Sequence, residues 1–458
     1  MKIRSILTAV LFTFLLELPA LAGNEHEHLQ YLPRYSDIAG ATRSLSLRNL
    51  PAAEVLPDNY KEVILPRFQA GVIEKKEFLK ARNTLSFGEF ADLIARKIPG
   101  ANAEMVMQGF FELMPSHPDA LNSYRNAGTI RNHLFKFHPE LVSRSVIHYL
   151  HASHAFLNMK SVYTVPVGLM DPAILSPIAK EFAKKRIQVQ FYASITRTTL
   201  ASDEAFASRL HAVEAAVQEG WLHGVDLVGS LSDAGGQPGT FEGLKTNLDL
   251  LFKSSRDHGY GVRIHAFEST SSGVFYEALH KSLWGCVKNG VFPPVLRIGH
   301  IRHLTGDFLR QLEAMQYYAS NTGISFEPVF EMNLESNLQL VAGNVFDTVQ
   351  VVQRLHELGM KVVIGSDGAG ILGQKSRFDV AILQLQDAGL GAFSTERLID
   401  DAYTPLAAPV LEPWVVESWK KEASLIKKVV KDARILRHQR VPACGLFLQR
   451  IVDSSAAD

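Results

Sequence analysis

Cysteine is nearly absent from this sequence, since Cys286 and Cys444 are the only two among 458 residues. Two cysteines cannot form the disulfide framework of a domain of this size. Neither lies in a C-x-x-C pattern, which argues against a thiol redox centre or a structural zinc site. We therefore expect either one disulfide between them or two buried thiols.

An excess of charge of one sign is also missing, because 47 Lys and Arg residues balance 47 Asp and Glu residues. Nucleic-acid binding usually requires a basic surplus, so we expect no nucleic-acid partner. No apolar run beyond residue 22 is long enough to cross a membrane. With 47% hydrophobic and 21% charged residues, the chain has the composition of a protein with a large folded core.

Residues 1–22 have the pattern of a secretory signal peptide. Lys2 and Arg4 form the charged start, Ile6 to Leu16 the apolar stretch, and Ala20-Leu21-Ala22 the small-residue cleavage site. The apolar stretch is shorter than the roughly 20 residues of a membrane span. We therefore expect an exported protein, periplasmic or extracellular.

The rest of the chain divides into three parts by its pattern. Residues 23–145 contain few strand-like runs, and apolar residues at helical spacing predict helices over Phe87 to Ile94 and Glu104 to Phe111. We predict that this part holds the first strand of the main sheet and a helical insertion. Residues 146–412 alternate between strand and helix patterns, and residues 413–458 begin with a lysine-rich helical segment.

Seven short strand-like runs lie in the alternating part, with helical patterns between most of them. They span 161–167, 186–195, 224–229, 261–268, 295–300, 324–331 and 361–367. Such alternation predicts a parallel sheet, and no G-x-G-x-x-G turn supports a doubly wound nucleotide-binding fold. We predict an α/β fold, a TIM-type (β/α)8 barrel with an N-terminal helical extension or insertion, whose eighth strand lies between residues 26 and 45.

Residues with metal-binding or acid–base side chains follow the predicted strands at their carboxyl ends, where barrel enzymes place their active sites. His265 and Asp367 close two different strands and suit a divalent ion such as zinc. Glu268 lies beyond the end of its strand and is a candidate proton carrier. His300 follows the next strand and is a candidate to orient a hydroxide or to stabilise developing charge. Taken singly, each residue also has a structural interpretation, such as a helix cap for Asp367.

Five segments of the chain resemble, in order, the motifs of the adenosine deaminase family, most closely its secreted, growth-factor-related branch. The family patterns are D-L-[AV]-G, H-A-G-E, R-I-G-H-G, E-V-C-P-x-S-N and S-D-D-P-A. The matching segments are Asp226-Leu227-Val228-Gly229, His265-Ala266-Phe267-Glu268, Arg297-Ile298-Gly299-His300, Glu331-Met332-Asn333-Leu334-Glu335-Ser336-Asn337 and Ser366-Asp367-Gly368.

The resemblance implies that His265 and Asp367 ligate one zinc ion, that Glu268 shuttles a proton and that His300 holds the hydroxide. The backbone amide of Gly229 would contact a purine nitrogen. The implied reaction is zinc-assisted hydrolytic deamination of adenosine or a related aminopurine nucleoside to inosine and ammonia. The expected partner is thus a small purine nucleoside, and a homodimer is left open.

The chain departs from the family pattern at three points. Phe267 replaces a glycine and is expected to place a ring at the mouth of the site, and Gly368 replaces the second aspartate. The family's first strand ends in H-x-H, whereas here His26-Glu27-His28 directly follows the predicted cleavage site. With no strand before it, we expect the first strand to lie instead over Leu32 to Ala41, with Tyr35 and Asp37 in the positions of the histidines.

Two functions are therefore weighed. The first is an exported, zinc-dependent adenosine deaminase-like hydrolase. The second is a degenerate barrel that has lost its metal and serves as a nucleoside-binding or interaction protein. The first strand discriminates between them: His26 and His28 beside His265 and Asp367 favour the enzyme, while Tyr35 and Asp37 in that place favour the degenerate barrel.

Overall fold

The structure is a computed structural model of the whole chain. It describes residues 24–438 apart from the segments 43–45, 65–71, 113–119, 153–159, 230–239, 268–272, 337–344, 368–377 and 405–412 and the single residues 32, 186, 303, 335 and 366. The predicted signal peptide (residues 1–22), Glu268, Gly368 and Cys444 lie outside the described residues.

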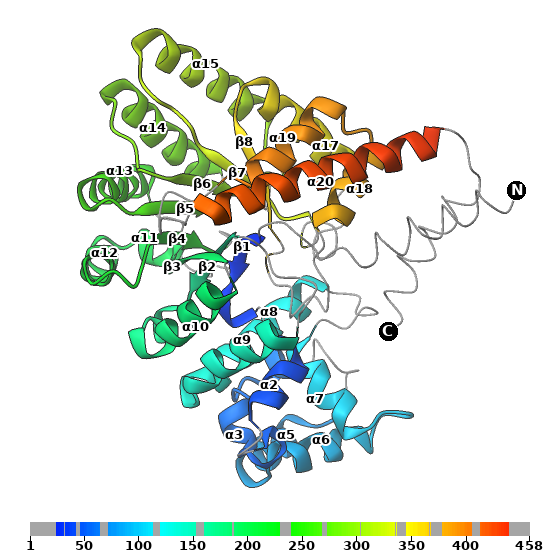
Figure 1. Cartoon of the computed structure of the whole chain (residues 1–458). Helices are drawn as coiled ribbons and strands as arrows, with labels where there is room; N and C mark the ends of the chain where they lie inside the picture. The colour runs from blue at the N-terminus through cyan, green and yellow to red at the C-terminus, as the bar shows by residue number, and fades with distance from the viewer. Residues whose placement is uncertain are drawn as a thin grey trace, which may run out of the picture.

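Eight parallel strands form one sheet in which each strand pairs with its neighbour in the sequence (Figure 1). They are β1 Asn24–His28, β2 Lys160–Val165, β3 Gln188–Thr196, β4 Gly224–Val228, β5 Gly261–His265, β6 Leu296–Gly299, β7 Val329–Met332 and β8 Lys361–Ile364. The sheet curls until β1 and β8 contact each other. The predicted α/β fold of the TIM-barrel type is therefore confirmed.

The first strand is where the sequence-based expectation was wrong. The Leu32–Ala41 segment is not a strand, because α2 (Tyr35–Ala41) is helical. The H-x-H segment itself forms β1, in which His28 pairs in register with Thr164 of β2. A preceding strand is unnecessary, since the parallel partner of β1 arrives from more than a hundred residues further along the chain.

A helical extension lies between β1 and β2 and forms the lower part of the molecule in Figure 1. Two of its helices, α6 and α7, cover the ranges predicted from the sequence. Ser86 and Glu89 form a capping box at the start of α6, and Asn102 caps α7. Its elements are η1 Leu29–Tyr31, α2 Tyr35–Ala41, η2 Leu47–Asn49, α3 Ala52–Val55, α4 Tyr60–Val63, α5 Lys75–Thr84, α6 Phe87–Ala95, α7 Ala103–Phe111, α8 Ala120–Phe137 and α9 Glu140–Ala152.

Helices follow each later strand and cover the outside of the sheet (Figure 1). They are η3 Val167–Leu169, α10 Pro172–Lys184, α11 Arg197–Leu200, α12 Asp203–Gln218, α13 Phe241–His258, α14 Gly273–Asn289, α15 Gly306–Thr322, α17 Val345–Glu357, α18 Phe378–Asp387, α19 Ala392–Ala402 and α20 Pro413–His438. α13 and α15 each end at a glycine in the left-handed conformation, Gly259 and Gly323, which lets the chain turn back toward the next strand.

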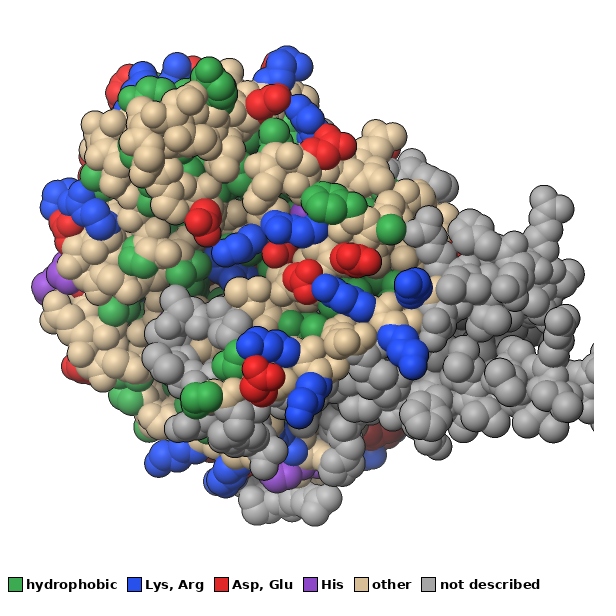
Figure 2. All heavy atoms as spheres, turned by 45° about the horizontal axis from the view of Figure 1, so that its top comes forward, with side chains coloured by type: hydrophobic (Ala, Val, Ile, Leu, Met, Phe, Trp, Pro, Cys, Tyr) green, Lys and Arg blue, Asp and Glu red, His purple; other side chains and the backbone are tan. Residues whose placement is uncertain are grey.

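The surface agrees with the balanced charge of the sequence. Figure 2 shows lysine and arginine side chains interspersed with aspartate and glutamate on one face, rather than gathered into a basic patch. Within the described part of the chain, no helix has both the length and the apolarity that a membrane span needs. Cys286 is a free, buried thiol in α14, and burial raises its pKa to about 12.

Candidate metal centre

Three of the predicted site residues meet at the carboxyl end of the sheet. His265 is the last residue of β5, His300 follows β6 directly, and Asp367 lies three residues beyond β8. Each offers one ligand atom, and these atoms lie within 4.8 Å of one another. All three residues are buried, at 4% exposure or less. Two histidines and a carboxylate are a donor set that suits a divalent ion such as zinc, so the residues present fit a metal.

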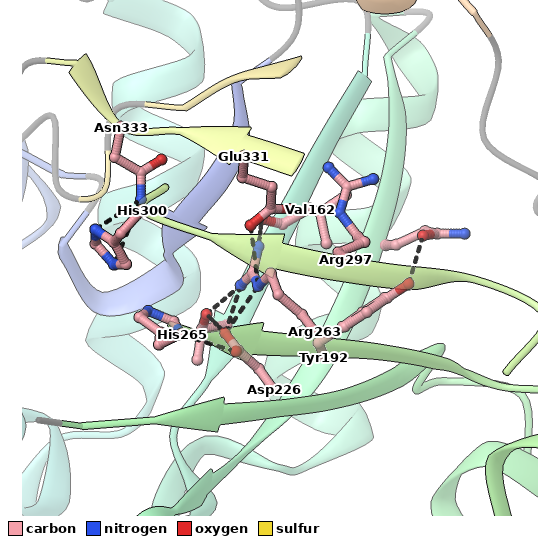
Figure 3. Close-up of polar contacts among 11 residues, drawn as sticks. Val162, Tyr192, Asp226, Arg263, His265, Arg297, His300, Glu331 and Asn333 are labelled. Carbon is pink, nitrogen blue, oxygen red and sulfur yellow. Dashed lines mark hydrogen bonds and ion pairs between the residues drawn. The ribbon is translucent and has the colours of Figure 1, made fainter. Parts of the chain in front are cut away.

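The orientation of His265 is fixed by a buried carboxylate on the neighbouring strand. Its Nδ1 lies 2.9 Å from Oδ1 of Asp226 in β4 (Figure 3). An ionised carboxylate only accepts hydrogen bonds, so Nδ1 of His265 is the donor in this contact. This is the arrangement that prepares an imidazole to bind a metal ion through Nε2.

Asp226 is in turn held by groups from two other strands. Arg263 donates to Asp226 Oδ2 from Nε at 2.9 Å and from Nη2 at 2.7 Å. The Thr164 hydroxyl donates to the same oxygen, and Arg263 also donates to the Val162 carbonyl at 3.1 Å. Asp226 and Arg263 are both fully buried. The carboxylate that orients His265 is therefore itself held by a charged partner, Arg263, and a neutral one, Thr164.

A second buried ion pair lies beside the first. Arg297 of β6 donates from Nε to Oε1 of Glu331 in β7, and Oε2 of Glu331 lies 4.0 Å from Arg263 Nε (Figure 3). Burial lowers the pKa of Arg263, but the carboxylates of Asp226 and Glu331 outweigh it, so the pKa lies above its usual value. The two arginines and two carboxylates carry opposite and equal charge, and this balance permits four charged groups in the barrel interior.

His300 lies against His265, with ring centroids 5.0 Å apart. The side-chain amide of Asn333, just beyond β7, donates toward His300 Nδ1 at 3.3 Å. His300 has φ of 69° and Asp367 has φ of 65°, both in the left-handed region that non-glycine residues seldom adopt. Each such residue costs about 1–3 kcal/mol and persists only where the surroundings hold it, as at functional sites.

The ring of Phe267 is not at the mouth of the site, contrary to the expectation from the sequence. It stacks on Tyr276 of α14 at 4.5 Å between centroids and lies edge-on to Phe308 of α15, also at 4.5 Å. The Tyr276 hydroxyl accepts a hydrogen bond from the Phe267 amide at 2.8 Å, and Phe267 is 1% exposed. The bulky residue therefore packs against α14 and α15 rather than over the cluster.

Gly229 directly follows β4 and has φ of 95°, a conformation that favours glycine. It is exposed at the same end of the sheet as the three clustered residues. Its expected contact with a purine nitrogen stays a prediction. Glu268 directly follows Phe267, but it lies outside the described residues, so its role also stays a prediction.

Tyr35 and Asp37, the alternatives to the histidines, take no part in the cluster among the described residues. Both lie in α2 of the helical extension. Asp37 Oδ1 lies 2.9 Å from Nδ1 of His148 in α9, and the Tyr35 amide donates to the Glu112 carboxylate at 2.7 Å. These contacts join α2 to its neighbouring helices and explain both residues without a metal.

Two features of the site escaped the sequence reasoning. In the sequence Asp226 belongs only to a turn motif, whereas in the structure it orients His265. A signal was available, because a charged residue inside an apolar strand run, as in Val225-Asp226-Leu227 or Val262-Arg263-Ile264, is costly unless it is paired. The second feature is Tyr124 of α8, whose hydroxyl donates to the Asp367 carbonyl at 2.6 Å. No local sequence pattern indicates this contact, because the two residues lie far apart in the chain.

Comparisons with known proteins add little to this description. No family model matches the sequence, and no curated protein matches it either. Among solved structures, an amidohydrolase from Burkholderia ambifaria with bound Zn is similar at a TM-score of 0.45 and 13% identity. The similarity covers 91% of this chain and 92% of that chain.

Proposed function

We propose that this chain is an adenosine deaminase-like hydrolase that removes ammonia from adenosine or a related aminopurine nucleoside. The observation that carries the proposal is the buried cluster of His265, His300 and Asp367 at the carboxyl ends of β5, β6 and β8. Three strand-end residues that the motifs single out lie within reach of one ion, at the edge where barrel enzymes bind substrates. The ordered motifs of the sequence supply the substrate class.

His265 and Asp367 are the proposed ligands of one zinc ion, and the arrangement around them supports this role. Nδ1 of His265 is engaged by Asp226, so Nε2 is the proposed ligand atom. When bound, zinc supplies the Lewis acidity that makes water nucleophilic near neutral pH. His300 lies against His265 in a position to serve as a third ligand or to orient the attacking water.

His26 and His28 complete the proposed site. Both lie in β1, the strand that corresponds to the first strand of the family pattern. His28 pairs with Thr164, whose hydroxyl contacts the Asp226 carboxylate. The register therefore supports the reading in which the first strand supplies histidines, and it removes the reason for preferring Tyr35 and Asp37.

In the proposed reaction, water adds to the ring carbon that bears the amino group, and that group leaves as ammonia to give inosine. Glu268 is proposed to carry a proton from the attacking water to the ring nitrogen and then to the leaving group. His300 is proposed to stabilise the developing negative charge. The amide of Gly229 is proposed to donate to the purine ring.

Export belongs to the same proposal. The pattern of residues 1–22 supports cleavage after Ala22, and β1 begins two residues later, at Asn24. Cleavage there would leave the whole first strand in the mature protein. Amino-terminal sequencing of protein recovered from the periplasm or the medium tests this point: a start at residue 23 is expected, and a retained Met1 contradicts it.

The test of the activity follows the ultraviolet absorbance of adenosine and deoxyadenosine together with ammonia release. The zinc-loaded wild type is expected to convert at least one of them, and His265→Ala is expected to be inactive. His211→Ala is the matched control, since its side chain is 88% exposed on α12 and it should keep full activity. Zinc-loaded protein that releases no ammonia from any aminopurine nucleoside contradicts the proposal, and nucleoside binding without metal would support the degenerate barrel instead.

A further inference from the structure

One contact joins the helical extension to the candidate metal centre. The Tyr124 hydroxyl of α8 donates to the main-chain carbonyl of Asp367 at 2.6 Å, across a separation of 243 residues. A hydrogen bond to a main-chain carbonyl fixes the peptide group rather than the side chain. The contact therefore acts on the backbone from which the Asp367 carboxylate projects into the cluster.

The backbone at Asp367 needs such support. Its φ of 65° lies in the left-handed region, where an aspartate is tolerated at a cost. Asp367 lies three residues beyond the end of β8, outside the residues that pair with β7. If the peptide relaxed to an ordinary conformation, the carboxylate would turn away from His265 and His300.

Tyr124 itself is braced from the end of β1. Tyr31, in η1, lies edge-on to Tyr124 with ring centroids 5.6 Å apart. The Tyr31 hydroxyl presses on Gly128, where an added Cβ would lie only 2.2 Å from the hydroxyl oxygen. Only glycine admits this approach. Burial raises the pKa of the Tyr31 hydroxyl to about 12, so this hydroxyl is protonated and uncharged near neutral pH.

We propose that Tyr124 is a positioning residue that holds Asp367 in its ligand conformation. The helical extension, through Tyr124, would thereby contribute to metal binding. The chain of contacts runs from the end of β1 through Tyr31 and Tyr124 to the end of β8. It links the two edges of the sheet at the point where a metal would sit. The inference rests on the metal centre of the proposed function, but not on its substrate.

The test compares two tyrosine-to-phenylalanine variants of the full chain. Tyr124→Phe removes one hydroxyl and keeps the ring, while the control Tyr60→Phe removes a hydroxyl that donates to the Ile73 carbonyl at 2.5 Å elsewhere in the extension. Metal-free protein is titrated with zinc and with cobalt against a chelator, and the visible spectrum of the cobalt form is recorded. We expect Tyr124→Phe to bind both ions roughly tenfold more weakly and to change the cobalt spectrum. Tyr60→Phe should match the wild type in both.

Gly128→Ala provides a second, independent variant. Alanine normally stabilises a helix relative to glycine. Here it must displace Tyr31 and with it Tyr124, so we expect weaker metal binding even where thermal stability is kept. Tyr124→Phe with unchanged affinity and an unchanged cobalt spectrum overturns the inference, as does a wild type that binds neither ion. Metal binding of the expected pattern without deamination leaves the inference standing and refutes only the proposed activity.

Discussion

Asp226→Asn is the substitution whose effect the structure defines most closely. It keeps the size of the side chain and removes one negative charge from a fully buried position. In the wild type, Arg263 and Arg297 balance Asp226 and Glu331, and Arg263 makes two bonds to Asp226 at 2.9 and 2.7 Å. The variant leaves an uncompensated positive charge in the barrel interior, because Glu331 already pairs with Arg297 and lies 4.0 Å from Arg263.

Breaking a buried ion pair by removing one partner costs about 3–5 kcal/mol of unfolding free energy. An unfolding entropy of about 2.1 cal/mol/K per residue means that a chain of 458 residues loses about 1 °C in Tm for each kcal/mol. We therefore expect Asp226→Asn to lower the Tm by about 3–5 °C in scanning calorimetry. It should also weaken zinc binding, because Nδ1 of His265 then donates to a neutral amide oxygen instead of a charged carboxylate.

Asp92→Asn is the matched control for this substitution. Asp92 pairs with Arg48 at 3.4 Å, and both side chains are 48% exposed. Exposed pairs contribute about 0–1 kcal/mol, so the control should shift the Tm by no more than about 1 °C. The reasoning is refuted if the two variants lower the Tm equally, because burial would then make no difference to the worth of the pair.

The remaining predictions concern groups away from the cluster. Burial and the charge of Arg397 lower the pKa of His356 to about 4, while Nε2 of this residue lies 3.9 Å from Asp401, beyond hydrogen-bonding distance. As the pH falls, the unfolded chain therefore takes up a proton at this histidine before the folded protein does. The free energy of unfolding keeps its full value above pH 6.5 and falls by up to about 3 kcal/mol as the pH drops toward 4. His356→Leu should lessen this loss in unfolding curves measured between pH 7 and 4, and an unchanged loss argues against the assignment. The Cys286 thiol, with its pKa raised to about 12 and 7% exposure, should react with a thiol reagent only after denaturation. Rapid labelling of the native protein at Cys286, identified by peptide mapping, would contradict its burial.

The strands β2 to β8 could be predicted because short apolar runs in the sequence indicate buried strands. Val225, Leu227, Val262 and Ile264 alternate with charged residues whose pairing only the structure reveals. The site followed from the strand ends, since parallel strands bring their carboxyl ends to one edge. For that reason His265, His300 and Asp367 could be expected to meet, and they do.

The first strand could not be predicted in the same way. Asn24-Glu25-His26-Glu27-His28 contains no apolar residue, so hydrophobic periodicity gives it no strand signal. Its strand conformation comes from pairing with β2, which lies beyond the whole helical extension. The segment that looked more apolar, Leu32–Ala41, became the helix α2 and the place of the Asp37–His148 pair. Tertiary pairing outweighed local preference in β1.

Metal content tests the central claim most directly. The full-length mature protein, reconstituted with zinc and passed through a desalting column, is analysed by inductively coupled plasma mass spectrometry beside His265→Ala, Asp367→Asn and the control His211→Ala. The cluster of His265, His300 and Asp367 predicts about one zinc per chain in the wild type and the control, and a loss of most of it in the other two variants. A wild type that retains no zinc, or a His265→Ala variant that retains as much as the wild type, would contradict the account.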